Sequence, residues 1–223
     1  MCFQVKIISP LKATQADLDR RQQRYREATR PETKLVVENL RRGPAALDTA
    51  GDVLLSAAAI FRQGKKTARE DCQAILIDCV FDPAVGELRE ATGVPTFGPT
   101  QITLPLISMV SENFSIIART ARQCELLAEI VDGYGYSQQI RSLRALGIRY
   151  EEAKQADIFN RVMLERIEEA VDGDGAKAVL FGSTTMAITA EMRKISKGAP
   201  LFMPGMVALQ VMEQLWYGGL WPG

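Results

Sequence analysis

The sequence predicts an α/β protein with two similar lobes, each containing a mostly parallel sheet flanked by helices. Near-continuous aliphatic segments such as 74–79 alternate with helical segments, a pattern typical of parallel strands covered on both faces. The same order of aliphatic strand, turn, helix and X-Pro strand also occurs twice, at 74–110 and at 178–215. Two copies of one supersecondary unit indicate two pseudo-symmetric, Rossmann-like lobes.

The two copies align residue by residue. Cys79 aligns with Ser183 without a gap, and after a one-residue insertion Phe97 aligns with Phe202. Ligands of open parallel sheets gather beyond the carboxyl ends of the strands. We therefore expect both lobes to present the end of a central strand to one shared cleft, with Cys79 on one wall and Ser183 on the other.

Strand and helix signals follow one another along the whole chain. The segment 3–9 alternates and then becomes apolar, as a buried strand does, and 14–29 is a polar helix with Thr14 or Asp17 as its cap. The other expected strands are 34–39, 74–79, 94–97, 113–118, 141–146, 178–182 and 200–203, and the other expected helices are 52–65, a helix from 100, 120–134, 151–173, 185–196 and 207–216.

The last helix follows the second copy as the helix from 100 follows the first. In duplicated folds such a final helix often packs back on the first lobe. We therefore expect a first lobe formed by 1–98 and 205–223, a second lobe formed by 99–204, and the active cleft between them.

Composition limits the classes of partner. Lys plus Arg number 27 and Asp plus Glu number 27, so no net charge draws the chain to nucleic acid or to an anionic membrane. The sequence has no apolar run of about 18 residues and no signal-peptide pattern at its start, which favours a cytoplasmic protein. Its four cysteines lack C-x-x-C spacing and are expected to be free thiols. Apolar helices and an aromatic tail are compatible with a homo-oligomer.

Histidine is absent, which excludes Ser-His-Asp and Cys-His catalysis and makes a zinc site hard to build. Proton transfer must then fall to Cys, Asp, Glu, Lys or Tyr. Asp78 and Asp82 flank Cys79 and could suggest a magnesium site. The favoured interpretation has no metal: Asp82 caps a helix that begins at Pro83, and Asp78 bonds across the cleft.

Cys79 and Ser183 are the candidate reactive residues. A cysteine at the end of a buried strand is often a small core residue, but the turn after Cys79 enters a helix whose free N–H groups favour a thiolate or a bound carboxylate. Ser183, Thr184 and Thr185 combine hydroxyls with N–H groups before a second helix, which predicts an anion-binding turn. The alternative for Ser183 is an ordinary helix cap.

Five segments together resemble a known family, one of them Y-G-Y-S-Q-Q-I-R-S-L-R-A-L-G-I at 134–148. The other four read I-D-C-V-F-D-P-A-V at 77–85, V-P-T-F-G-P at 94–99, F-S-I-I-A-R-T at 114–120 and D-G-A-K-A-V-L-F-G-S-T-T-M at 174–186. This layout resembles the aspartate/glutamate/hydantoin racemase superfamily, with its allantoin racemase, maleate isomerase and arylmalonate decarboxylase relatives. The resemblance implies an enzyme that needs no cofactor and moves a proton by cysteine chemistry on a small carboxylate or cyclic imide, such as an amino acid or a hydantoin.

The resemblance also implies roles for particular residues. Cys79 matches the first catalytic cysteine, and Ser183 stands where most racemases have the second. Many members have Asn-Pro-Asn-Thr where this chain has Ser-Pro-Leu-Lys from Ser9, and Thr-Thr where it has Ala118-Arg119. The implied substrate-binding residues are Ser9, Val80, Ala118, Arg119, Thr184 and Thr185.

The serine at position 183 leaves the reaction open. A serine hydroxyl is a far weaker acid than a cysteine thiol, whose ordinary pKa is about 8.5, so a symmetrical exchange between two bases is disfavoured. A cis-trans isomerase or a decarboxylase that uses Cys79 alone is one alternative. A binding protein that holds carboxylates without catalysis is the other.

Overall fold

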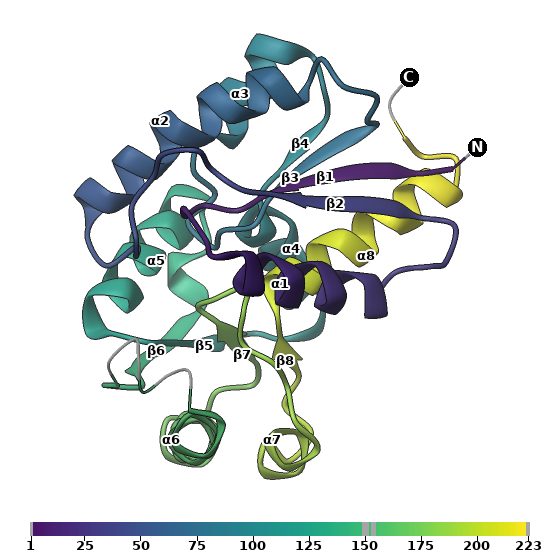
Figure 1. Cartoon of the computed structure of the whole chain (residues 1–223). Helices are drawn as coiled ribbons and strands as arrows, with labels where there is room; N and C mark the ends of the chain where they lie inside the picture. The colour runs from purple at the N-terminus through teal and green to yellow at the C-terminus, as the bar shows by residue number, and fades with distance from the viewer. Residues whose placement is uncertain (1, 149–151, 153–154, 222–223) are drawn as a thin grey trace. The chain divides into compact units, whose positions relative to one another are not determined.

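The structure is a computed structural model that describes residues 2–148, 152 and 155–221. It contains two four-stranded sheets in which every paired strand is parallel, with helices flanking each sheet (Figure 1). The predicted α/β class, with parallel sheets covered by helices, is thereby confirmed. The chain forms two compact units: unit 1 comprises Met1–Ile102 and Gly205–Gly223, and unit 2 comprises Thr103–Pro204.

The two sheets have the same topology. Sheet A has the order β2-β1-β3-β4 and sheet B the order β6-β5-β7-β8. The strands are β1 (Gln4–Ile8), β2 (Lys34–Glu38), β3 (Ala74–Ile77), β4 (Thr96–Phe97), β5 (Phe114–Ala118), β6 (Ile140–Ala145), β7 (Val179–Phe181) and β8 (Leu201–Phe202). Leu76 pairs with Phe97 in sheet A, and Leu180 pairs with Phe202 in sheet B. The aligned phenylalanines thus occupy the same register position, which confirms the sequence repeat.

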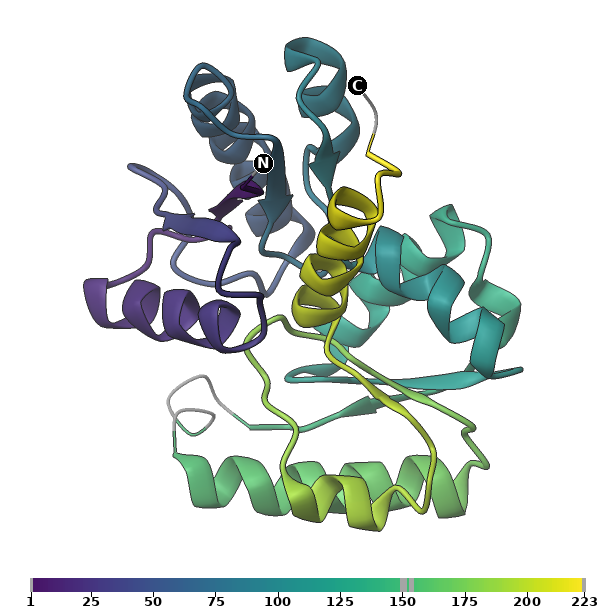
Figure 2. The same ribbon diagram turned by 90° about the vertical axis from the view of Figure 1, so that its right-hand side faces the viewer.

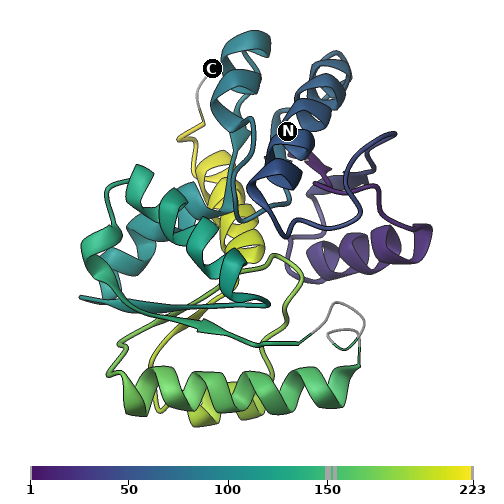
Figure 3. The same cartoon turned by 90° about the vertical axis from the view of Figure 1, so that its left-hand side faces the viewer.

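Helices cover both faces of each sheet. They are α1 (Gln15–Glu27), α2 (Ala50–Thr67), α3 (Val85–Thr92), α4 (Pro99–Val110), α5 (Ala121–Gly133), α6 (Ala156–Glu168), α7 (Ala190–Ile195) and α8 (Pro204–Tyr217). In unit 1, α1 and α8 lie on one face of sheet A and α2 and α3 on the other (Figure 1). In unit 2, α6 and α7 lie side by side on one face of sheet B (Figure 2), and α5 lies on the opposite face (Figure 3).

Burial from both faces explains the aliphatic central strands. All four residues of β3 and all five of β5 are buried, so neither strand has a side that faces solvent. Threonine caps begin several helices: Thr14, Thr49, Thr120 and Thr189 each accept a hydrogen bond from the backbone N–H three residues later. The predicted cap at Thr14 is confirmed.

Two predicted helices differ from the structure. The helix expected at 185–196 begins only at Ala190, because Thr189 caps it and the preceding residues form a turn. The helix expected at 151–173 begins at Ala156 and changes at Glu169 to a π-helical turn, Glu169–Gly173. Its predicted start at position 151 lies outside the described residues.

The C-terminal helix α8 is part of unit 1. The buried Glu213 accepts hydrogen bonds from the backbone N–H of Arg30 (3.0 Å) and from the Thr33 hydroxyl. Trp216 stacks on Phe3, with the ring centroids 5.2 Å apart. Polar and aromatic contacts therefore tie the end of the chain to the loop before β2 and to the residue before β1.

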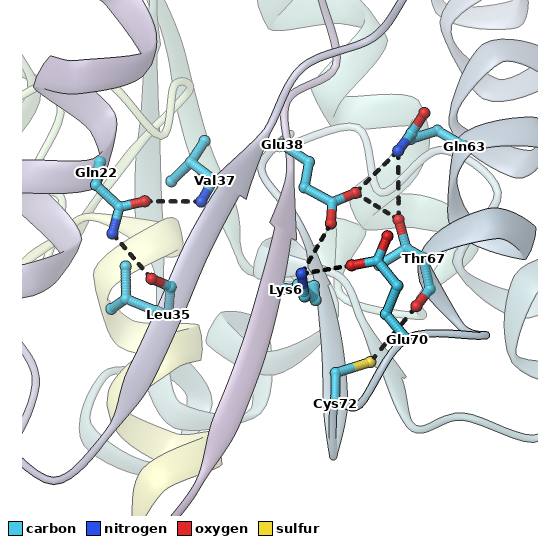
Figure 4. A network of polar contacts seen from close by, with 9 residues as sticks. All are labelled: Lys6, Gln22, Leu35, Val37, Glu38, Gln63, Thr67, Glu70 and Cys72. Atoms are coloured by element: carbon cyan, nitrogen blue, oxygen red, sulfur yellow. Dashed lines mark hydrogen bonds and ion pairs between the residues drawn. The ribbon is translucent and has the colours of Figure 1, made fainter.

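A side chain of α1 covers the outer edge of sheet A (Figure 4). Gln22 donates to the carbonyl of Leu35 (2.9 Å) and accepts from the N–H of Val37 (2.8 Å), so it replaces a neighbouring strand for β2. Figure 4 also shows Lys6 between the carboxylates of Glu38 (3.3 Å) and Glu70 (2.6 Å).

Among the described helices, none is long and apolar enough to cross a membrane.

Candidate active site

Cys79 lies in a tight turn at the carboxyl end of β3. Its N–H donates to the carbonyl of Ile77 (2.8 Å), and its carbonyl accepts from the N–H of Asp82 (3.1 Å). The backbone is left-handed at Asp82 and at Ala84, with φ of 46° and 60°. The chain therefore turns sharply after the strand, and Cys79 is only 3% exposed.

Asp82 holds this turn against the next helix. Its carboxylate accepts hydrogen bonds from the backbone N–H groups of Thr100 (3.1 Å) and Gln101 (2.7 Å) at the start of α4. The Thr100 hydroxyl in turn donates to the carbonyl of Val80 (2.6 Å). Asp82 therefore caps α4, and its expected role as the cap of a helix from Pro83 is wrong.

The helix after the Cys79 turn also begins later than expected. Helix α3 starts at Val85 after Ala84, which makes no side-chain cap. The free N–H groups at the start of α3, which the sequence predicted next to the thiol, therefore lie several residues further along the chain than Cys79. Burial is the largest influence and raises the pKa of Cys79 above its ordinary value, although a hydrogen bond from the Phe81 N–H to the sulfur acts in the opposite direction.

Asp78, the residue before Cys79, pairs with helix α1. Its N–H continues the sheet by donating to the carbonyl of Ile8 (2.9 Å). Its carboxylate accepts from the Tyr25 hydroxyl (2.6 Å) and forms an ion pair with Arg21. The carboxylate that the sequence assigned to a bond across the cleft therefore has two partners within unit 1.

Ser9 directly follows β1, the strand next to β3. Its N–H donates to the carbonyl of Glu38 (2.9 Å), and its hydroxyl lies 3.3 Å from the carbonyl oxygen of Leu11. Ile8 and Ile77 are partners in the parallel register, so Ser9 and Cys79 follow neighbouring strands at one edge of sheet A. The structure thus brings Ser9, Cys79 and Val80 together.

Ser183 follows β7 at the equivalent edge of sheet B. Its hydroxyl lies 2.9 Å from the Thr185 hydroxyl and accepts from the Thr185 N–H (3.2 Å), which is a local serine turn. Thr184 is buried and Thr185 is exposed. Because α7 begins only at Ala190, the predicted position of Ser183 at a helix N-terminus is wrong.

Ala118 is the last residue of β5 and Arg119 follows it, next to the segment that contains Ser183. Their carbonyls accept from the N–H groups of Leu146 (2.8 Å) and Gly147 (3.1 Å). Gly182 donates to the carbonyl of Ile117, the residue before Ala118, at 2.7 Å. The structure thus brings Ala118, Arg119 and the hydroxyls of 183–185 together at one edge of sheet B.

The predicted site residues therefore form two groups, one in each unit, and their meeting in one cleft stays a prediction.

Sequence reasoning missed three neighbours of the Cys79 turn: Arg21, Tyr25 and Thr100. The available signal for Tyr25 was a lone aromatic residue in a polar helix. No cluster of three or more Cys, Asp or Glu suited to a metal ion occurs among the residues that the structure describes.

Comparison with known proteins assigns the chain to a family. The model of the Asp/Glu/Hydantoin racemase family matches residues 5–212, which include both groups of site residues. The chain belongs to this family. A hydantoin racemase from Pseudomonas sp. (strain NS671) is 28% identical over 209 residues, covering 92% of this chain and 82% of that protein.

Solved structures of a racemase, an isomerase and a decarboxylase share the fold of this member of the Asp/Glu/hydantoin racemase family. Allantoin racemase from Pseudomonas fluorescens superposes with a TM-score of 0.86 at 18% identity, over 97% of this chain and 92% of the other. The maleate isomerase of Pseudomonas putida S16 gives 0.71 at 12% identity, over 97% and 94%. Arylmalonate decarboxylase gives 0.65 at 15% identity, over 97% and 93%. The resemblance inferred from the sequence motifs is confirmed at the level of the superfamily.

Proposed function

We propose that this protein is a cofactor-independent enzyme that transfers a proton at an acidic carbon of a small carboxylate or cyclic imide, with a hydantoin-like compound as the first candidate. The observation that carries the proposal is the position of Cys79. It follows the buried central strand β3 within the part of the chain that matches the racemase family. The similarity to a hydantoin racemase supports the substrate class.

Cys79 is the proposed acid/base group. As a thiolate it removes the proton from the substrate carbon, and the resulting thiol returns a proton to the carbanion. Because burial raises the pKa of Cys79, the thiolate is scarce at neutral pH. Turnover that depends on the thiolate should therefore increase as the pH rises through the alkaline range.

Ser183 is proposed to bind or to donate a hydrogen bond rather than to act as a second base. Its hydroxyl is paired with the hydroxyl and the N–H of Thr185, and the chain contains no histidine to activate it. An oxygen of the substrate carboxylate or imide can replace one of these local partners. Thr185 is exposed and is the second hydroxyl proposed for this role.

Proton exchange in heavy water tests the proposal directly. Single enantiomers of hydantoins, allantoin and amino acids, together with maleate-like diacids, are incubated with the protein, and deuterium incorporation is followed by NMR. We expect exchange at the acidic carbon of at least one compound, with its loss in Cys79→Ala. Cys124→Ala is the matched control, because Cys124 is another buried thiol and lies on α5. Exchange that persists in Cys79→Ala would contradict the proposal.

One-sided chemistry by Cys79 is the second candidate, and the serine at position 183 favours it. A single base can return the proton only from the side on which it was removed, so deuterium should enter without loss of optical activity. Ser183→Cys then provides the decisive comparison. Racemisation that appears in this variant indicates that only the second thiol was missing, whereas racemisation by the unchanged protein excludes the one-sided reaction. Saturable binding without exchange of any compound would instead favour the carboxylate-binding alternative.

A further inference from the structure

A buried charge pair lies directly beside the residue on which the proposed function depends. The side chain of Asp78 is 1% exposed and that of its ion-pair partner Arg21 is 11% exposed. The Tyr25 hydroxyl donates to the other carboxylate oxygen of Asp78 at 2.6 Å. Positions 21 and 25 lie one turn apart on the same face of α1. Helix α1 therefore holds the carboxylate that immediately precedes Cys79.

Charges from the turn after β3 and from α1 act on the Cys79 thiol. The carboxylates of Asp82 and Asp78 raise the pKa of Cys79 after burial itself, whereas the Arg21 guanidinium lowers it. Asp82 is held by the backbone of α4, and Arg24 is a second cation of α1 whose charge interacts with Asp78. Arg21 is thus the cation that both pairs with Asp78 and acts on the sulfur.

We propose that Arg21 is a positioning residue for Cys79: it compensates the Asp78 carboxylate beside the thiol and anchors the strand end that carries the sulfur. The inference rests on the proposed function, because it assigns a residue that prepares the proposed acid/base group. Without the guanidinium, the buried Asp78 carboxylate would lose its ion-pair partner, and its negative charge next to the sulfur would disfavour the thiolate more strongly. Without the carboxylate, the guanidinium would favour the thiolate.

These opposite signs separate an electrostatic role from a merely structural one. The test measures the alkylation rate of Cys79 by iodoacetamide as a function of pH in the full-length protein, with mass spectrometry of the Cys79 peptide. In Arg21→Gln we expect a rate about tenfold lower near pH 8, equivalent to one unit of thiol pKa. In Asp78→Asn we expect a faster reaction, and in the double variant a rate close to that of the unchanged protein.

Arg20→Gln is the matched control, because Arg20 is 63% exposed and pairs with Asp17 on the same helix. It should leave the pH profile unchanged. Shifts of the same sign in Arg21→Gln and Asp78→Asn, or an unchanged profile in a folded Arg21→Gln, would overturn the inference. Circular dichroism reports folding. If Arg21→Gln does not fold, Arg21→Lys replaces it, and this variant should keep the alkylation rate within about threefold because it keeps the positive charge. Asp78→Asn should still accelerate the alkylation. Failure of either expectation overturns the inference.

This titration needs no substrate, so its outcome is independent of the proton-exchange experiment. Opposite shifts in the two variants, with no exchange of any compound, would support the role of Arg21 on the thiol and remove the proposed enzymatic function. Exchange that depends on Cys79, with identical thiol titrations in all variants, would support the function and overturn the role of Arg21.

Discussion

Gly98 lies so close to Asp82 that a Cβ atom at position 98 would be 2.3 Å from the Asp82 carboxyl carbon. The space left by the missing side chain is occupied by the carboxylate that caps α4 through the N–H groups of Thr100 and Gln101. Because Asp82 also closes the turn that begins at Cys79, this contact joins the candidate catalytic turn to the next helix.

Gly98→Ala should therefore destabilise the protein, by about 1–3 kcal/mol, because the new methyl group displaces the Asp82 carboxylate from its helix cap. The free energy of unfolding in urea measures the effect. Gly86→Ala is the matched control: Gly86 is exposed on α3 and a Cβ there meets nothing within 4 Å. Alanine is the better helix former, so the control should be neutral or slightly stabilising. Equal losses in the two variants would contradict this account.

The equivalent turn in sheet B makes a second prediction. A Cβ at Gly182 would lie 2.6 Å from the Cβ of Ala118, at the point where β5 and β7 end side by side. Gly182→Ala should cost about 1–3 kcal/mol of unfolding free energy and reduce any proton exchange, because it separates Ala118 from the Ser183 turn. Gly133→Ala, where a Cβ would meet nothing within 4 Å, should unfold like the unchanged protein. An unaffected Gly182→Ala would show that the strand ends can move apart freely.

The edge of sheet A depends on one amide side chain. Gln22→Ala should lower the free energy of unfolding by about 1–2 kcal/mol, because the N–H of Val37 and the carbonyl of Leu35 lose their partner. An uncovered strand edge also favours association between chains, which light scattering detects during storage. Gln23→Ala is the control, since Gln23 is exposed and donates a hydrogen bond to Glu27 on its own helix. Matching losses in both variants would exclude edge protection as the cause.

Tyr25 should make the fold sensitive to alkali. Burial, followed by the negative charge of Asp78, raises the pKa of Tyr25 well above its ordinary value of 10. Because the folded state holds this proton more tightly than the unfolded state, the contribution to stability is complete below about pH 10 and is lost as the pH rises through the folded-state pKa.

Tyr25→Phe should thus flatten the fall in unfolding free energy above about pH 10. Near neutral pH the variant should be less stable by about 1–2 kcal/mol, because Asp78 loses a donor. Urea unfolding from about pH 8 to about pH 11 gives both quantities. Cys79 is present in both proteins, so their difference isolates the tyrosine. The half-buried Tyr136 provides the control Tyr136→Phe, and the same flattening there would refute the assignment to Tyr25.

Much of the fold was predictable because its signals are local or repeated. Near-continuous aliphatic residues predicted β3, since a strand covered on both faces has no exposed side. The repeat predicted that Phe97 and Phe202 hold corresponding places, and each pairs with the matching leucine of its sheet. The family was likewise predictable from the motifs around Cys79 and Ser183, which lie within the matched residues.

Helix starts near the site were less predictable. The sequence Asp82-Pro83 has the pattern of a cap followed by the first residue of a helix, yet the carboxylate turns away to α4. The hydroxyls after Gly182 also have the composition of a cap, but they bond to one another. A cap forms with whichever backbone N–H groups come within reach, and their positions depend on packing between distant elements.

The sequence by itself determined the order of strands and helices, the duplication and the positions of Cys79 and Ser183 at the ends of central strands, because these follow from hydrophobic periodicity and from motif spacing. Only the tertiary structure decided that Asp78 pairs with Arg21 and Tyr25, and that burial raises the pKa of the neighbouring thiol. Ionisation and charge pairing depend on which groups folding removes from water together, and residues more than fifty positions apart along the chain carry no local sign of that meeting.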